Sequence, residues 1–205
     1  MPRAKRSLDP VATRAAISRA ALRLFTAHGF AGTSLGGIAA AAKVHKSLVS
    51  HHFGSKEDLW NTVKRDLFAS YGGEQAARLQ ANAASGQLLI DSLREYFLWL
   101  KRNPGFLRLM AWRDLERNAA LSDPEAALID LGRQRMREAQ EAGILRADLD
   151  SDCALFAVFA MLEAWFTSSK RACFPVADAA DADERFLATV LGLINGGLIA
   201  RQGKP

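Results

Sequence analysis

The chain has 205 residues, of which 49% are hydrophobic and 24% are charged, and its formal net charge is +5. This length is enough for a buried core in one or two domains, and no apolar run reaches the roughly 18 residues of a membrane-spanning helix. The basic N-terminus lacks the apolar stretch of a secretory signal, and the two cysteines predict no disulfide framework. We therefore expect a cytoplasmic protein that does not enter the membrane.

The first three expected elements are helices between about residues 14 and 54. Gly29 predicts the end of the first helix, because glycine readily adopts the left-handed backbone of a helix end. Thr33 or Ser34 is a suitable N-cap for a second, short helix. A tight turn at residues 43–44 then leads to a third helix that starts at His45 or Ser47. Apolar residues repeat with the helical period over the first two helices at Ile17, Ala20, Ala21, Leu24, Phe25, Leu35, Ile38, Ala39 and Ala42.

Positive charge is concentrated in the same part of the chain. Residues 1–66 hold 11 Lys and Arg against 4 Asp and Glu, a net charge of +7, whereas the remaining residues have a net charge of −2. A basic face is typical of phosphate binding; the alternative is that these residues only solvate a small domain. Two short helices joined by a tight turn match the helix-turn-helix unit, whose second helix enters the DNA major groove. Pattern and charge together predict sequence-specific DNA binding.

Six further helices are expected beyond residue 56, and the alternation typical of strands is absent. Gly72 and Gly73 are expected to weaken or kink the first of them, and the segment 175–183 is expected to be a loop. The expected ranges are about 57–79, 89–100, 106–117, 123–142, 151–169 and 182–200. The predicted fold class is therefore all-α, with a three-helix DNA-binding head at residues 1–55 and a six-helix body at residues 56–205.

The sequence from Arg14 to Leu59 resembles the tetracycline-repressor (TetR) family of bacterial transcriptional regulators. The match is ordered and free of gaps over about the first sixty residues, and the rest is similar to the family in the number and order of its helices. The resemblance implies a homodimeric repressor that leaves a palindromic operator when a small, largely apolar effector binds, and that uses no cofactor. The matching residues are Ile17, Ala20, Ala21, Leu24, Phe25, Gly29, Phe30, Thr33, Ser34, Ile38, Ala39, Ala42, Val44, His52, Phe53, Ser55, Lys56, Glu57 and Leu59.

Two sites depart from the family's usual pattern. Lys43 stands where the turn often has glycine, and a non-glycine residue at positive φ costs roughly 1 kcal/mol or more. Ser50 and His51 stand where the recognition helix commonly has tyrosines. The departure affects which operator is read rather than whether DNA is bound.

Roles in DNA binding can be assigned within the head. The candidates for base-edge contact are Lys46, Ser47, Leu48, Ser50 and His51. The candidates for phosphate contact are Thr33, Ser34, Lys43, His45, His52 and Lys56, some of them through backbone N–H groups at helix starts. His52 has a structural role as an equal alternative. Arg3, Lys5 and Arg6 form a basic arm that tracks the DNA backbone or reaches a minor groove; the alternative is that the arm is disordered without DNA.

The resemblance implies that the last two long helices pair with their copies in a twofold four-helix interface. Helix 151–169 is apolar on more than one face, so it must be buried on both sides. Gly192, Gly196 and Gly197 allow close approach. The alternative is that both helices are buried within their own domain. The expected interface residues are Phe156, Phe166, Phe186, Val190, Leu193, Ile194 and Gly197.

The middle helices are expected to enclose the effector pocket, although a plain apolar core is the alternative for each single residue. Arg113 and Glu163 are the charged residues nearest the apolar runs, and a buried charge needs a partner. Glu163 in the pocket would favour a cationic ligand. The candidate lining residues are Leu93, Phe97, Leu100, Phe106, Met110, Trp112, Arg113, Met136, Phe159, Glu163 and Trp165.

Other classes of function are less well supported by the sequence. All four histidines lie between residues 28 and 52, so the body offers no histidine base for a Ser or Cys nucleophile. Zinc-binding and phosphate-loop motifs are absent from the sequence, and we expect neither an enzyme nor a metal site. Two alternatives stay open: a DNA-binding or architectural protein without an effector, and a helical interaction module that has lost DNA binding.

Overall fold

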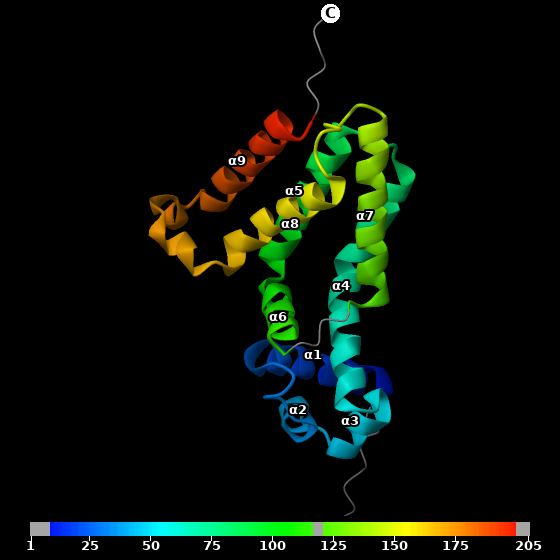
Figure 1. The fold of residues 1–205 in the computed structure, drawn as a ribbon. Helices are drawn as coiled ribbons and strands as arrows, with labels where there is room; N and C mark the ends of the chain where they lie inside the picture. Colours follow the sequence, from blue (N-terminus) through cyan, green and yellow to red (C-terminus); the bar gives the residue numbers. More distant parts are fainter. Residues whose placement is uncertain (1–8, 117–120, 200–205) are drawn as a thin grey trace, which may run out of the picture. The chain divides into compact units, whose positions relative to one another are not determined.

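The computed structural model describes residues 9–116 and 121–199, and this part of the chain is helical (Figure 1). The basic arm with Arg3, Lys5 and Arg6 lies outside the described residues. The α-helices are α1 (Pro10–His28), α2 (Leu35–Ala42), α3 (Lys46–Phe53), α4 (Lys56–Ala81), α5 (Gly86–Arg102), α6 (Pro104–Leu115), α7 (Asp123–Glu141), α8 (Ser151–Thr167) and α9 (Ala182–Gly197). The all-α prediction and the order of three head helices followed by six more are confirmed for the described residues.

The segment 175–183, which was expected to be a loop, holds a short 3-10 helix, η2 (Pro175–Asp178), before α9 begins. A further 3-10 helix, η1 (Ser169–Cys173), lies between α8 and η2. Helix α4 continues through Gly72 and Gly73 to Ala81, so the two glycines do not end it. A Cβ built at Gly72 would lie 2.5 Å from the Phe68 ring, so glycine leaves room for this aromatic side chain. Packing therefore outweighs the low helix propensity of glycine at this point.

The chain divides into two compact units, with boundaries inside α4, inside α6 and directly before α7. Unit 1 runs to Leu67 and includes Arg108–Ser122, and unit 2 holds Phe68–Leu107 and the residues from Asp123 onward. The domain boundary predicted from the sequence lies after residue 55. The difference arises because the beginning of α4 supplies core residues to unit 1, among them Leu59 and Trp60, which are both fully buried.

The core of unit 1 is formed by the apolar faces of α1, α2 and α3 with the beginning of α4. The ring of Phe25 meets the Trp60 ring edge-on at a centroid distance of 5.0 Å, and Phe30 lies 5.8 Å from Trp60. Burial of such large side chains contributes most of the stability of a small domain. The buried residues of the three head helices include Ile17, Ala20, Ala21, Phe25, Ile38, Ala39, Val49 and Phe53.

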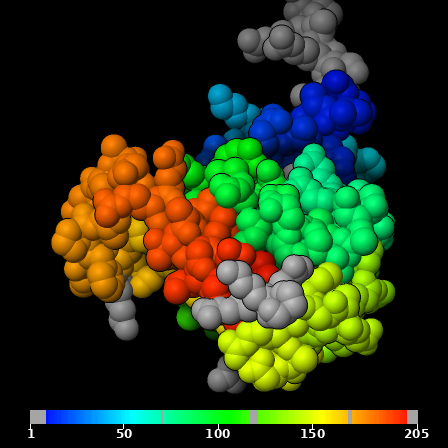
Figure 2. All heavy atoms as spheres, turned by 90° about the horizontal axis from the view of Figure 1, so that it is seen from above, coloured from blue at the N-terminus to red at the C-terminus, as the bar shows by residue number. Residues whose placement is uncertain are grey.

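In unit 2, α5 packs on α8 and α9, and α7 packs on α8. The inner face of α5 carries Leu93, Tyr96, Phe97, Trp99 and Leu100, all of which are buried. Backbone bonds also join the end of α9 to the segment before α8, where Arg146 N donates to Leu198 O at 3.0 Å. Figure 2 shows the orange-red atoms of α9 at the surface of this unit. No helix among the described residues is long and apolar enough to cross a membrane.

Candidate nucleic-acid interface and effector site

Helices α2 and α3 form a tight helix-turn-helix. Ser34 caps α2 by accepting a hydrogen bond from the Gly37 N–H at 3.0 Å, as its residue type predicts. Lys43 adopts the left-handed conformation, with φ 58° and ψ 42°. This conformation lets Lys43 N donate to Ala40 O at 3.1 Å and Val44 N donate to Ala39 O at 3.0 Å. The two bonds close the end of α2 and place the start of α3 only a few residues later.

The outer face of α3 carries the side chains that were predicted to contact bases. Lys46, Ser47, Ser50 and His51 are exposed, and Leu48 is half-buried. Val49 and Phe53 on the opposite side are buried in the core of unit 1. Helix α3 therefore presents a polar, hydrogen-bonding face while its apolar face fixes its orientation, which is the arrangement that major-groove reading requires.

The residues predicted to contact phosphate fall into two groups. Ser34, Lys43 and His45 are exposed. Thr33 is buried, and its Oγ1 donates to Gly29 O at 2.7 Å. The Lys56 ammonium donates to Phe30 O at 3.0 Å and to Thr33 O at 3.1 Å, and it lies 4.1 Å from the centre of the Phe30 ring. The polar groups of Thr33 and Lys56 thus hold the head together, where the sequence analysis expected them to face DNA.

Arg14 is a residue that the sequence analysis missed. Its Nη1 donates to the backbone oxygen of His52 at 2.8 Å, and its guanidinium lies 4.3 Å from the centre of the Phe53 ring. These contacts join α1 to the last turn of α3. The half-buried His52 therefore lies at a structural junction. Spacing alone gave no signal for this contact, because Arg14 and His52 are 38 residues apart.

The residues predicted to line an effector pocket are divided between the two units. Met110, Trp112 and Arg113 belong to unit 1, whereas the others belong to unit 2. The indole N–H of Trp112 donates to Thr26 O at 3.2 Å, within unit 1. Arg113 is paired with Asp114, with 3.1 Å between Nε and Oδ1. Trp112 therefore lies beside the end of α1, and this contact was not predicted from the sequence.

Glu163 meets a cluster of aromatic rings in unit 2. The Tyr96 hydroxyl donates to Glu163 Oε1 at 2.6 Å. Burial raises the pKa of Tyr96, and the charge of Glu163 raises it further, so Tyr96 stays a neutral donor. Around Tyr96, ring centroids lie at 5.2 Å for Phe159 and 5.4 Å for Tyr71. The predicted residues Glu163 and Phe159 are therefore brought together, with two tyrosines that the sequence analysis did not select.

Trp165 belongs to a polar network at the start of α9. Its indole N–H donates to Asp183 Oδ1 at 2.7 Å, and its ring stacks on Phe186 at 4.2 Å. Asp183 also pairs with Lys101 at 2.9 Å and with Arg171 at 3.4 Å. Partial burial pushes the pKa of Asp183 up, but the hydrogen bonds from Trp165 and Lys101 outweigh it and leave the pKa below its ordinary value. The network joins α5, η1, α8 and α9.

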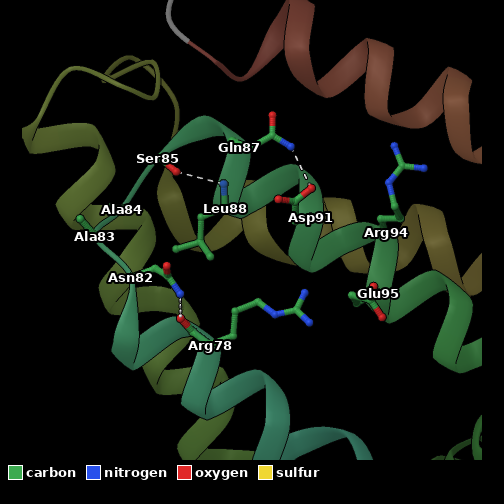
Figure 3. Close-up of a pocket in the computed structure, with 10 residues that line it drawn as sticks. All are labelled: Arg78, Asn82, Ala83, Ala84, Ser85, Gln87, Leu88, Asp91, Arg94 and Glu95. Atoms are coloured by element: carbon green, nitrogen blue, oxygen red, sulfur yellow. Dashed lines mark hydrogen bonds between the residues drawn. The ribbon is translucent and has the colours of Figure 1, made fainter.

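A cavity of about 590 Å³ lies between the end of α4 and the first turns of α5 (Figure 3). The side chain of Arg78 extends from α4 towards α5, and Gln87 donates to Asp91 at 2.8 Å. None of the predicted effector-binding residues lines this cavity, which is walled by Arg78, Asn82, Ala83, Ala84, Ser85, Gln87, Leu88, Asp91, Arg94 and Glu95. Its polar lining differs from the apolar pocket that the sequence analysis expected.

The residues predicted to form the dimer interface divide by exposure. Val190 and Ile194 are buried within their own unit. Phe166 and Phe186 are half-buried and contact the Phe97 ring at centroid distances of 4.9 and 6.0 Å. Phe156 and Leu193 are 75% and 62% exposed, whereas Gly197 is half-buried. Several exposed residues near Phe156 and Leu193 are small, namely Cys153, Ala157, Ala160 and Ala164 on α8 and Ala188, Gly192 and Gly196 on α9, whereas Asp152 and Thr189 are exposed polar residues one turn away.

Comparison with known proteins identifies both parts of the chain. Residues 10–63 match the family model described as bacterial regulatory proteins, tetR family, and residues 94–191 match the model of the tetracyclin repressor-like C-terminal domain. Together these matches cover well over half of the chain.

Individual relatives agree with this assignment. The repressor SCO4008 of Streptomyces coelicolor is 29% identical over 75% of this chain and 78% of its own. The repressor NicS of Pseudomonas putida is 28% identical over 82% and 83%. Among solved structures, the putative regulator SCO4942 of Streptomyces coelicolor has a TM-score of 0.73 at 26% identity, over 91% of this chain and 98% of its own. These relatives are named as transcriptional regulators rather than as enzymes, and the chain belongs to the tetR family of bacterial regulatory proteins.

Proposed function

We propose that this regulator is a dimeric repressor that binds a palindromic operator and is released by a small, largely apolar effector. The observation that carries the proposal is the exposed polar face of α3, held on a buried apolar face within a basic head. The net charge of +7 over residues 1–66 attracts the DNA backbone, and α3 supplies sequence preference.

In this proposal the exposed residues of the head contact DNA. Lys46, Ser47, Leu48, Ser50 and His51 read base edges, and Ser34, Lys43 and His45 bind phosphates. The start of α2 adds backbone N–H groups, which favour an anion at a helix N-terminus. Thr33 and Lys56 serve binding by fixing the backbone between α1 and α2, because their polar groups are engaged there.

The surface of α8 and α9 supports a twofold dimer. Phe156 and Leu193 are large apolar side chains at the surface, and several of the exposed residues near them are alanine or glycine. Small residues let helices of a second copy approach closely, and burying the two large side chains is favourable. A twofold dimer places its two α3 helices in major grooves at equivalent half-sites of a palindrome.

The effector is proposed to bind in the body among the aromatic residues near Glu163. Support comes from the cluster of Tyr71, Tyr96 and Phe159 with the Glu163 carboxylate. A solved structure with this fold is AibR in complex with isovaleryl coenzyme A and operator DNA; its TM-score is 0.68 at 21% identity, over 88% of this chain and 97% of its own. Helix α4 has residues in both units and is the element through which we expect binding to alter the spacing of the two α3 helices.

The decisive experiment is selection of bound duplexes from a random pool at low and moderate salt. We expect one palindrome to be enriched at both concentrations. A variant with Ser47, Ser50 and His51 replaced by alanine is the matched control, since these residues are exposed and their loss leaves the core intact. Recovery of unenriched DNA that dissociates at moderate salt would contradict the proposal and favour an architectural protein that binds only the backbone.

The effector part of the proposal needs its own test. A thermal-shift screen of small apolar and cationic molecules, followed by operator-binding assays, should find a compound that both stabilises the protein and weakens operator binding. A ligand can shift the protein only by its difference in affinity for the two states. Stabilising compounds that never change operator affinity would favour the alternative of a regulator without an effector.

A further inference from the structure

The end of α6 holds the turn that follows α1. Glu116 accepts two backbone hydrogen bonds there, from Phe30 N to Oε2 and from Ala31 N to Oε1, both at 3.0 Å. One turn earlier on α6, the Trp112 indole N–H donates to Thr26 O. All of these residues belong to unit 1. A carboxylate that binds two adjacent amides fixes the direction of the backbone more strongly than a single neutral hydrogen bond.

Gly29 shows how closely α6 approaches this turn. Its φ is +71°, a conformation that side chains disfavour. A Cβ built at this position would lie 2.5 Å from Glu116 Oε1 and 2.7 Å from the Trp112 ring. Glycine is therefore needed both for its backbone conformation and for the space that Glu116 and Trp112 occupy.

The same turn is held on its other side by α4. Phe30 O and Thr33 O accept hydrogen bonds from the Lys56 ammonium. The backbone of residues 30–33 thus lies between the carboxylate of Glu116, the residue that follows α6, and the ammonium of Lys56 on α4. The next residue is Ser34, the N-cap of α2. The position at which α2 begins is consequently set by these two charged groups.

We propose that Glu116 is a positioning residue for DNA binding, which holds the amides of Phe30 and Ala31 so that α2 and α3 are presented in their DNA-binding orientation. The role is indirect, since Glu116 acts through the backbone of the turn and its negative charge would repel phosphate. The proposal rests on the DNA-binding function proposed above. It extends that function to a residue 63 positions beyond Phe53, the last residue of α3.

The charge of Glu116 makes the test discriminating. Removing a negative charge from a DNA-binding protein by itself strengthens binding to phosphates. If Glu116 positions the turn, Glu116→Ala instead weakens affinity for the selected palindrome, by about tenfold if the loss is near 1.4 kcal/mol. Glu116→Gln keeps one acceptor oxygen and should lose less. Asp114→Asn is the matched control, because Asp114 is an exposed carboxylate on the same turn of α6 and pairs with Arg113.

The experiment compares the four proteins for affinity to the palindrome, affinity to an unrelated duplex, and hydrogen exchange at the Phe30 and Ala31 amides. We expect Glu116→Ala to bind the palindrome more weakly and to exchange these amides faster, while its affinity for the unrelated duplex is unchanged or higher. Asp114→Asn should match the wild type in amide exchange and bind both duplexes at least as well. Should Glu116→Ala fail to fold, Glu116→Gln is the variant to compare with Asp114→Asn, and Trp112→Phe, which keeps an aromatic ring but loses the indole N–H donor to Thr26 O and part of the ring volume, is a second one.

Two results would overturn the proposal. One is a Glu116→Ala protein that binds the palindrome as tightly as Asp114→Asn does. The other is unchanged exchange at Phe30 and Ala31. Failure of the proposed DNA-binding function is recognised separately, because the wild type would then enrich no palindrome. The hydrogen-exchange measurement would still report whether Glu116 holds the turn.

Discussion

Lys43 combines an unfavourable backbone with a position suited to phosphate binding. Its φ of 58° is in the left-handed region, where a residue with a Cβ is less stable than glycine. The Lys43→Gly change should therefore stabilise the head by about 1 kcal/mol. The same change removes an exposed ammonium and should weaken operator binding and reduce its salt dependence, by a slope of about 0.9 if one phosphate contact is lost.

Urea denaturation and binding titrations at several salt concentrations measure the two effects separately. Lys43→Ala is the control, since it removes the ammonium and keeps the Cβ. It should lose the phosphate contact without gaining stability. Equal stability of the glycine and alanine variants would mean that the left-handed backbone carries no measurable cost here.

Single residues also show what could be predicted from the sequence. Local chemistry predicts Thr33 or Ser34 as the cap of α2, and the structure has Ser34 there. The positive φ of Lys43 was suggested by the family resemblance, which often has glycine at this turn. The roles of Glu116, Trp112 and Arg14 depend on contacts across 38 to 86 residues. Spacing within one helix contains no information on such contacts, so these residues could not have been selected.

At the level of elements, the network around Asp183 links the end of α5 to η1, α8 and α9. The pKa of Asp183 lies below its ordinary value of 3.8, so the ionised carboxylate stabilises the folded state above that pH. This stabilisation is lost as the pH falls through the lowered pKa. Asp183→Asn should therefore cost on the order of 1 kcal/mol at pH 7 and much less near pH 3.

The measurement is denaturation of wild type and variant across pH 3 to 7 at one protein concentration. Because other carboxylates titrate in the same range, the quantity to compare is the difference in the free energy of unfolding between the two proteins at each pH. Asp178→Asn, at an exposed position in η2, is the control and should leave the difference near zero. If the difference in the free energy of unfolding between wild type and Asp183→Asn is the same at all pH values, the charge of Asp183 does not contribute to stability.

The helices of the body illustrate a limit of periodicity. An apolar stripe on α9 was predicted to face a second copy, yet Val190 and Ile194 lie in the core of their own unit. Leu193, adjacent in sequence, is exposed. Both faces of a mostly apolar helix satisfy the same hydrophobic pattern, so the pattern cannot assign one face to the interior and the other to a partner.

For the whole molecule, the dimer proposal makes Phe156 the most informative position. Its side chain is 75% exposed, so Phe156→Asp removes nothing from the core of the unit. Burying a phenylalanine contributes about 1.5–3 kcal/mol, and a twofold interface does so twice, so the dimer dissociation constant should rise about a hundredfold or more. Sedimentation over a range of protein concentrations measures the change.

Phe174→Asp is the matched control, since Phe174 is also exposed, at 61%, but lies between η1 and η2 rather than on α8. It should leave the association of the chains unchanged. If Phe156→Asp dimerises as tightly as the wild type, the exposed surface of α8 is not the interface.

The same pair of variants tests how two copies read one operator. In a twofold dimer both α3 helices must meet major grooves on the same side of the duplex. Inserting about five base pairs between the half-sites turns one of them by about half a helical turn. The wild type and Phe174→Asp should then lose most of their affinity for the palindrome. The monomeric Phe156→Asp should bind the original palindrome, the expanded palindrome and a single half-site with the same affinity per site. Fluorescence titrations with these three duplexes measure the affinities. If the wild type binds the expanded palindrome as tightly as the original one, the two α3 helices of the dimer are not held in a fixed relative orientation.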